Sequence, residues 1–285
     1  MSLPAVDLNS LVATQYLSAV AVTLTLYERL LVFEKEVELI WRQPWSALPI
    51  LVLLDMYGRQ ASMLFIAYVV SGISTNISDS LLAFNRFIAT YGLLSTASIQ
   101  FVLVLRIYGL WDNRRIITIA LVGGFVVFYG ITVAFAVVST IQTSATAQYN
   151  EVYHACGVPH RPLYLIGAYA GTLAYYIYVM ILLVINSLNR PRKRDFEIIK
   201  NLYRDGVWTL LVFTVLQLAR LMPAIFGGTA QTLLTPLITW ALDGILSFRL
   251  YLTLKQVEVD ARKGWKTVTG SQQVFVFEEV EMDLK

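Results

Sequence analysis

Charged side chains stand inside several long apolar runs of the sequence, where a charge is costly unless it has a partner or a task. Asp55 and Arg59 are four residues apart, a spacing that puts them on one face of a helix. There they can form an ion pair, or they can belong to a pocket or a relay. Asp243 has no basic residue three or four positions away. Its partner must therefore come from another helix, from water or from a proton. Asp243 is the first candidate for a functional residue. The alternative is that it makes a buried helix–helix hydrogen bond.

Partners for Asp243 are available in two other apolar runs. We expect Arg59 at a similar depth, and Arg220, with Gln217 one turn before it, somewhat nearer the outer side. Arg106 ends the third run, where a charged residue can lock the cytoplasmic side of a bundle. For the remaining charges in the runs we expect anchoring, because long side chains can reach the headgroups: Glu28, Arg29, Arg204 and Arg249.

Other kinds of site find little support in the sequence. His154, Cys156 and His160 lie close together, but no carboxylate or second thiolate completes a metal-ligand spacing. The chain has no phosphate-binding glycine loop, no HExxH pair and no nucleophile elbow. We therefore expect no metal, no cofactor and no nucleic-acid partner. A single cysteine also excludes an intramolecular disulfide.

Seven apolar runs must position the charged residues, and each is long enough to cross about 30 Å of hydrocarbon as a helix. The composition agrees, because 57% of the residues are hydrophobic and 14% are charged, against about 25% charged in soluble domains. The first ten residues lack Lys and Arg, so we expect a retained first helix and not a cleaved signal peptide. We predict an all-α membrane domain over residues 1–254 and a cytoplasmic tail over 255–285, with spans at about 11–33, 47–70, 87–110, 116–139, 163–186, 205–226 and 231–254.

Basic residues divide unevenly between the two sides of this arrangement. Of 22 Lys and Arg, 14 fall in the loops after spans 1, 3 and 5 and in the tail, whereas two fall on the other side. The positive-inside rule then predicts an outer N-terminus and a cytoplasmic C-terminus. Asn76 begins a glycosylation sequon in a loop on the outer side, and it is glycosylated or simply polar. The basic stretch 190–204 is expected to contact anionic inner-leaflet lipid.

The stretch YERLLVFEKEVELIWRQPWS, residues 27–46, carries many charges in an otherwise apolar region. We expect residues 27–33 to finish the first span and residues 34–42 to form the first cytoplasmic turn. Val37, Ile40 and Trp41 have helical spacing and should face lipid. A membrane boundary explains most of these charges without catalysis.

Residues 16–59, which include this stretch, resemble the N-terminal domain of a large fungal family of multi-pass membrane proteins, a domain of unknown function. The matching positions are Tyr16, Leu17, Tyr27, Glu28, Glu36, Val37, Ile40, Trp41, Trp45 and Ser46. The ending of the third span, LRIYGLW, is also similar to that of family members. At residues 54–57 this chain has LDMY where the family pattern has Asn-Arg-Tyr. The resemblance implies a fungal membrane protein and no established activity.

The seven-span layout also resembles that of G-protein-coupled receptors, although their motifs are missing. The third span ends in Arg106-Ile107-Tyr108 and not in an acidic-Arg-aromatic triplet. The seventh has Asp243 and Tyr251 without the Asn-Pro-x-x-Tyr pattern, and Cys156 has no disulfide partner. The layout therefore carries over, and the switch residues do not.

Three functional hypotheses follow. The first is a receptor-like sensor with a cytoplasmic signalling partner, in the plasma membrane or another membrane of the secretory pathway. The second is a membrane enzyme that starts terpene cyclisation with a buried carboxylic acid, for which Glu28, Asp55 and Asp243 are the candidates. The third is a small-solute transporter with Asp243 and Arg59 along its path. Two acids converging on one cavity favour the enzyme, whereas acids each paired with an arginine count against it.

Overall fold

A bundle of seven long helices makes up almost all of the computed structural model, which describes residues 8–43, 47–70, 81–110, 115–146, 148–150, 155–157, 163–189, 196–227 and 229–267. The elements are α1 (Leu8–Glu36), the π-helical turn η1 (Val37–Trp41), α2 (Ala47–Val70), α3 (Leu81–Leu110), α4 (Arg115–Thr146), β1 (Gln148–Asn150), β2 (Ala155–Gly157), α5 (Leu163–Asn189), α6 (Phe196–Phe226) and α7 (Thr229–Thr267). All seven helices are long and apolar enough to cross a membrane. The predicted multi-pass, all-helical membrane domain is therefore confirmed.

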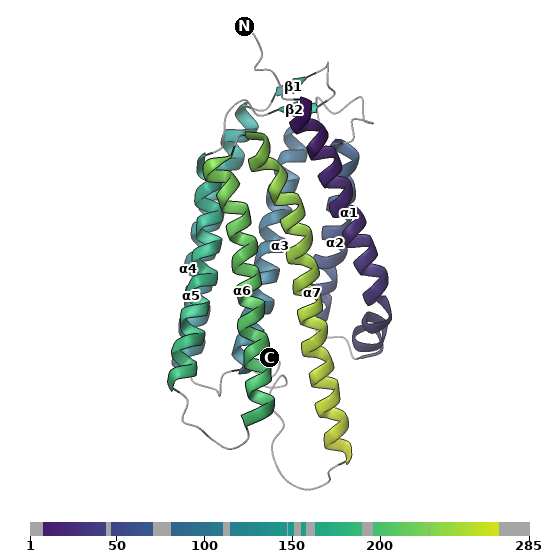
Figure 1. The fold of residues 1–285 in the computed structure, drawn as a ribbon, viewed down its shortest axis with the longest axis vertical. Helices are drawn as coiled ribbons and strands as arrows, with labels where there is room; N and C mark the ends of the chain where they lie inside the picture. Colours follow the sequence, from purple (N-terminus) through teal and green to yellow (C-terminus); the bar gives the residue numbers. More distant parts are fainter. Residues whose placement is uncertain are drawn as a thin grey trace.

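The helices run side by side along the long axis of the molecule (Figure 1). Along the chain, each helix packs on the one before it, and α1 closes the set by packing on α7. α3 takes the central place, because it contacts α2, α4, α6 and α7. Polar groups on α3 can therefore reach most of the bundle.

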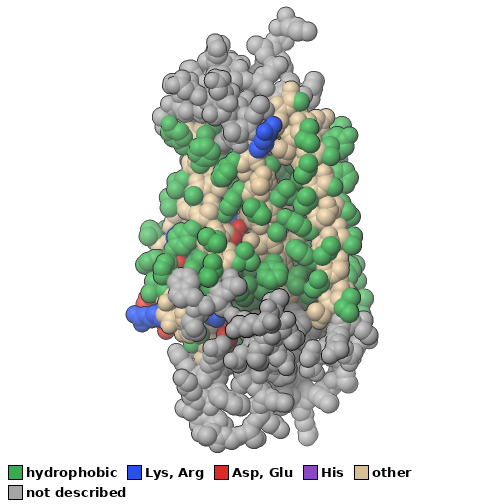
Figure 2. All heavy atoms as spheres, turned by 180° about the vertical axis from the view of Figure 1, so that it is seen from behind, with side chains coloured by type: hydrophobic (Ala, Val, Ile, Leu, Met, Phe, Trp, Pro, Cys, Tyr) green, Lys and Arg blue, Asp and Glu red, His purple; other side chains and the backbone are tan. Residues whose placement is uncertain are grey.

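The sides of the bundle are apolar. Large exposed side chains include Leu30, Val126 and Trp208, and Figure 2 shows hydrophobic side chains spread between the two ends with few charges among them. In water such a surface would be a severe liability, whereas hydrocarbon solvates it, and helices satisfy their backbone hydrogen bonds internally. The protein is an integral membrane protein of the multi-pass kind.

Two features of the fold were not predicted from the sequence. β1 and β2 form a short antiparallel hairpin between α4 and α5, with Tyr149 opposite Cys156, at the same end of the bundle as the start of α1 (Figure 1). The last helix continues to Thr267, so the first part of the expected tail is a helical extension of α7.

The π-helical turn corrects the expected lipid-facing set of residues 34–42. The helix does not end at the membrane boundary; it widens at η1, where the amide of Arg42 donates to the carbonyl of Val37 at 3.2 Å. The wider turn adds one residue and changes which side chains face inward. Ile40 is consequently buried in the core and not exposed to lipid, whereas Trp41 remains exposed.

Tyrosines join neighbouring helices in a repeated way. The hydroxyls of Tyr91, Tyr129 and Tyr178 each donate to a backbone carbonyl of the preceding helix, at 2.8, 3.0 and 2.9 Å. Tyr91 lies against Gly58 of α2, and Tyr178 lies against Gly124 of α4, where an added Cβ would overlap the tyrosine ring. Glycine at these two positions lets the ring approach close enough for its hydroxyl to reach the carbonyl.

This packing predicts opposite effects for two neighbouring glycines of α4. Gly124→Ala should destabilise the protein by about 1–3 kcal/mol, because the new methyl group must displace Tyr178. Gly123→Ala should instead stabilise it by about 0.5–1 kcal/mol, because a Cβ there meets nothing within 4 Å and alanine is the better helix former. Reversible unfolding of both variants in bicelles checks the sign, and equal effects would contradict the assigned contact.

Candidate functional site

A buried ion pair joins α6 to α7 in the interior of the bundle. Nη2 of Arg220 lies 2.7 Å from Oδ2 of Asp243, and Nε2 of Gln217 donates to the same oxygen at 3.2 Å. Asp243 is 1% exposed, and Gln217 and Arg220 are also buried. Arg220 further donates through Nε to Oγ1 of Thr239 at 2.6 Å. Of the two arginines considered as partners of Asp243, Arg220 makes the direct pair.

Arg59 approaches the same carboxylate from α2. Its guanidinium passes over Gly244, where a Cβ would overlap it, and it interacts electrostatically with Asp243. Arg59 also forms the expected i,i+4 ion pair with Asp55. Any side chain at position 244 would displace the Arg59 side chain, so this glycine leaves room for the guanidinium beside Asp243.

Four residues from three helices form a row of alternating charges. We call this row the central polar chain: Asp55, Arg59, Asp243 and Arg220. Its formal charge is zero, which offsets part of the cost of burying four ions in a low dielectric. It links α2 to α7 through Arg59 and α7 to α6 through Asp243. A change at Asp55 therefore has a physical route to α6.

Hydrogen bonding within this region is incomplete. Oδ1 of Asp243, Oε1 of Gln217 and Nε of Arg59 are buried and accept or donate no hydrogen bond among the residues described. Each such group costs about 1–3 kcal/mol of stability unless a partner is present. The arrangement is therefore one that water, a ligand or a second conformation would stabilise.

One end of the central polar chain reaches the membrane-facing surface. A pocket of about 430 Å³ between α2, α3 and α4 is lined by Asp55 and Tyr91 together with Leu51, Leu54, Leu94, Ala97, Ser98, Phe101 and Phe125. Most of these side chains are apolar, and Asp55 contributes the only charge. Small-molecule sites have this character: an apolar volume of about 300–1,000 Å³ with a few polar groups.

A second buried charged cluster lies where α1 ends, and it was not among the predicted sites. Glu36 is completely buried and pairs with Arg29, whose Nη1 lies 2.9 Å from Oε2. Its Oε1 accepts from Nε1 of Trp41 at 3.0 Å and from the hydroxyl of Tyr57 at 3.1 Å. Arg29 also stacks on the Tyr57 ring, 4.2 Å from the centroid. We call these four residues the Glu36 cluster; it connects α1, η1 and α2.

The remaining candidate residues are distributed differently. Glu28 pairs with Arg249 of α7 through two hydrogen bonds of 2.5 and 2.7 Å, at a position where Arg249 is largely exposed. Arg106 lies in α3, and its side chain is outside the described part of the structure. Asn76, His154 and His160 lie outside the described residues, as do residues 190–195 of the basic stretch. In the described part of the chain, no three His, Cys, Asp or Glu side chains are grouped as metal ligands.

One feature of the sequence indicates the Glu36 cluster, although α-helical spacing places its residues on different faces. Glu36 and Trp41 are five residues apart, which on an α-helix places them on different faces, whereas the π-helical turn brings them into contact. Both belong to the positions that resemble the fungal family. That likeness, and not the charge count, was the indication that Glu36 differs from Glu34 and Glu38.

Comparison with known proteins points to the same N-terminal segment. Residues 16–54 match the model of a family described as a family of unknown function (DUF6533). The matched segment covers most of α1, all of η1 and the beginning of α2, and therefore contains Glu36 and Trp41. No curated protein and no solved structure matches the chain. The N-terminal segment is thus a domain of unknown function within a membrane protein of seven candidate spanning helices.

Proposed function

We propose that this protein is a receptor-like sensor in which a ligand at the membrane-facing pocket acts through the central polar chain. One observation carries the proposal: Asp55 lines the pocket and pairs with Arg59, which interacts electrostatically with Asp243, the partner of Arg220 on α6. A ligand that donates a hydrogen bond to Asp55 competes with Arg59 for it. Arg59 is then free to bind Asp243 more strongly, in place of Arg220.

The last two helices have the features that such an exchange needs. Pro223 lies inside α6 and Pro236 inside α7, and a proline in a helix removes a backbone hydrogen bond and permits bending. The tight connection between the helices is held by the carbonyl of Pro223, which accepts from the amide of Gly227 at 2.9 Å and from Thr232 at 3.2 Å. Weakening the Asp243–Arg220 pair would let α6 move about this fixed end.

The topology required is an outer N-terminus and a cytoplasmic C-terminus, which the distribution of Lys and Arg favours. It places the β1–β2 hairpin outside and the starting end of α6, with the basic stretch 190–204, at the anionic inner leaflet. A cytoplasmic signalling partner would bind that face. The location would be the plasma membrane or another secretory-pathway membrane, Asn76 would be a glycosylation site, and the source would be a fungus, as the resemblance at residues 16–59 implies.

The enzyme hypothesis receives less support. Glu28, Asp55 and Asp243 each form an ion pair with an arginine, and an acid that initiates cyclisation must hold a proton to donate. Of the three, Asp55 lines one of the two pockets described, and Glu28 and Asp243 line neither. Neither of the two pockets is lined by two of these acids, as that mechanism would need.

A transporter would need a polar route along the bundle. The central polar chain runs across the helices and not along them, and Asp243 and Arg220 line neither described pocket. Proton-dependent flux in proteoliposomes that is lost in Asp243→Asn would nevertheless favour transport over sensing, and it is the discriminating assay.

The proposal predicts that cutting the central polar chain at α2 moves α6 relative to α7. Spin labels at positions 208 and 257, which are exposed on α6 and α7, report this distance in nanodiscs on a Cys156→Ser background. We expect Arg59→Gln to shift the distance distribution by about 2 Å or more. The matched control is Glu258→Gln, which removes a pair with Lys255 near the end of α7 and should leave the distribution unchanged. Identical distributions for Arg59→Gln and the parent would refute the coupling.

Signalling requires a separate measurement. Recruitment of G proteins to the cytoplasmic face, read by a split reporter while membrane-soluble amphiphiles are added, should depend on Asp55 and on Arg59. Absence of recruitment across a broad panel of G proteins would count against a receptor of that kind, even if the helix movement occurs.

A further inference from the structure

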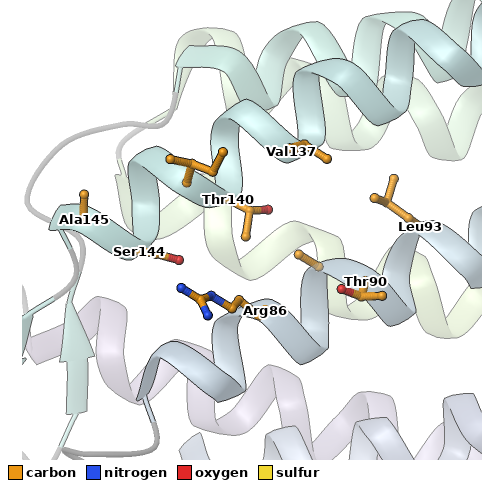
Figure 3. A pocket seen from close by; sticks show the side chains of 9 residues that line it. Arg86, Thr90, Leu93, Val137, Thr140, Ser144 and Ala145 are labelled. Atoms are coloured by element: carbon orange, nitrogen blue, oxygen red, sulfur yellow. The ribbon is translucent and has the colours of Figure 1, made fainter.

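A second membrane-facing groove lies between α3 and α4, separate from the central polar chain. It has a volume of about 420 Å³ and is lined by Arg86, Ala89, Thr90, Leu93, Val137, Thr140, Ile141, Ser144 and Ala145. Figure 3 shows the Arg86 side chain extending from α3 toward α4, on the side of Ser144, with Thr90 and Leu93 farther along the groove.

Among the described side chains, Arg86 has no acidic partner. Neither α3 nor α4 contains a single Asp or Glu, and no ion pair of Arg86 occurs among the described side chains, in contrast to Arg29, Arg59, Arg220 and Arg249. A guanidinium that faces a groove without a carboxylate is a ready donor to an anion, and phosphate oxygens suit its fork of N–H groups.

The position of Arg86 identifies the source of that anion. The apolar spans of α3 and α4 begin at Arg86 and end at Ala145, respectively, which puts the cationic end of the groove at the level of the lipid headgroups. From there the groove continues inward along Ala89, Leu93, Val137 and Ile141. A charged end at the interface followed by an apolar trough matches a phospholipid, with its phosphodiester outermost and an acyl chain inside.

We propose that the α3–α4 groove is a phospholipid site. In it Arg86 binds the phosphodiester, Thr90 supplies a second polar contact through its hydroxyl, and the apolar residues hold one acyl chain. The site is independent of the sensor function proposed above. A bound lipid would fill the groove between α3 and α4.

Native mass spectrometry of the full chain in detergent tests the site with dioleoyl phosphatidylcholine as the probe. The same-chain diacylglycerol lacks the phosphodiester, and glycerophosphocholine lacks the chains. We expect phosphatidylcholine to bind at least about tenfold more tightly than diacylglycerol or glycerophosphocholine. Diacylglycerol loses one charge-assisted hydrogen bond, and glycerophosphocholine loses the apolar contact. A photoreactive phosphatidylcholine should cross-link to peptides of α3 and α4.

Variants locate the binding in the groove. Arg86→Ala should weaken phosphatidylcholine binding about tenfold, Arg86→Lys should restore part of it, and Ala89→Phe should block the trough while the phosphate donor remains. The control Arg42→Ala removes another exposed arginine, after η1, and should change nothing. Equal binding of diacylglycerol, competition by inorganic phosphate alone, or full binding by Arg86→Ala would each overturn the proposal.

Discussion

Replacing Asp243 by alanine is expected to destabilise the protein by about 3 kcal/mol, because it leaves Arg220 buried among apolar helices without its counter-ion. Gln217 loses its acceptor in the same step. The free energy of unfolding, measured by reversible denaturation in bicelles, gives the value. Asp243→Asn should lose less, since an amide still accepts a hydrogen bond while the charge is gone.

A double substitution separates the ion pair from the loss of packing. Arg220→Met combined with Asp243→Leu removes both charges and keeps the volume, so it should be less destabilising than Asp243→Ala alone. The control is Glu28→Gln, whose partner Arg249 is largely exposed and can be solvated; its effect should be about 1 kcal/mol or less. If Asp243→Ala costs no more than Glu28→Gln, the carboxylate is not the partner on which Arg220 depends.

The second large effect is expected at Glu36. Glu36→Ala should cost about 2–3 kcal/mol, because Arg29, Trp41 and Tyr57 lose one shared acceptor. Hydrogen exchange should increase at η1 and at the beginning of α2, the segments that the cluster connects to α1. Unfolding in bicelles together with exchange measured by mass spectrometry checks both results.

Two neighbouring carboxylates provide the control for Glu36. Glu34 and Glu38 lie in the same segment but are exposed, so Glu34→Gln and Glu38→Gln should change stability by at most about 0.5 kcal/mol. Equal effects at all three positions would mean that Glu36 contributes only to surface charge. A selective effect at Glu36 would give the family-matched segment a structural task, namely holding the first connection of the bundle against α1 and α2.

The seven helices follow from the sequence because the physics that forms them is one-dimensional. A run of about 20 apolar residues in a bilayer has to satisfy its own backbone hydrogen bonds, and a helix is the local way to do so. The same local logic gave the Asp55–Arg59 pair, since i,i+4 spacing fixes neighbours on one helix. Neither result depends on how the helices pack.

Contacts between helices do depend on packing, and here the sequence left alternatives open. Depth favoured Arg59 as the partner of Asp243 and placed Arg220 somewhat nearer the outer side, whereas the packing of α6 on α7 decided for Arg220. Gly244 decided how Arg59 approaches, because only a residue without a Cβ leaves room for its guanidinium. Rotation of each helix about its axis sets these contacts, and a nearly uniform apolar composition carries little information about rotation.

The stretch from residue 27 to residue 46 shows the same division. Its charges predicted a membrane boundary, and α1 ends within this stretch, at Glu36. The α-helical spacing then placed Val37, Ile40 and Trp41 together on lipid, which was wrong for Ile40, because one π-helical turn shifts the phase of every residue after it. The sequence by itself determined which segments cross the membrane. The tertiary structure alone decided which charges meet inside it, because a single extra residue in a turn, or a single missing Cβ, redirects side chains without altering the hydropathy of the chain.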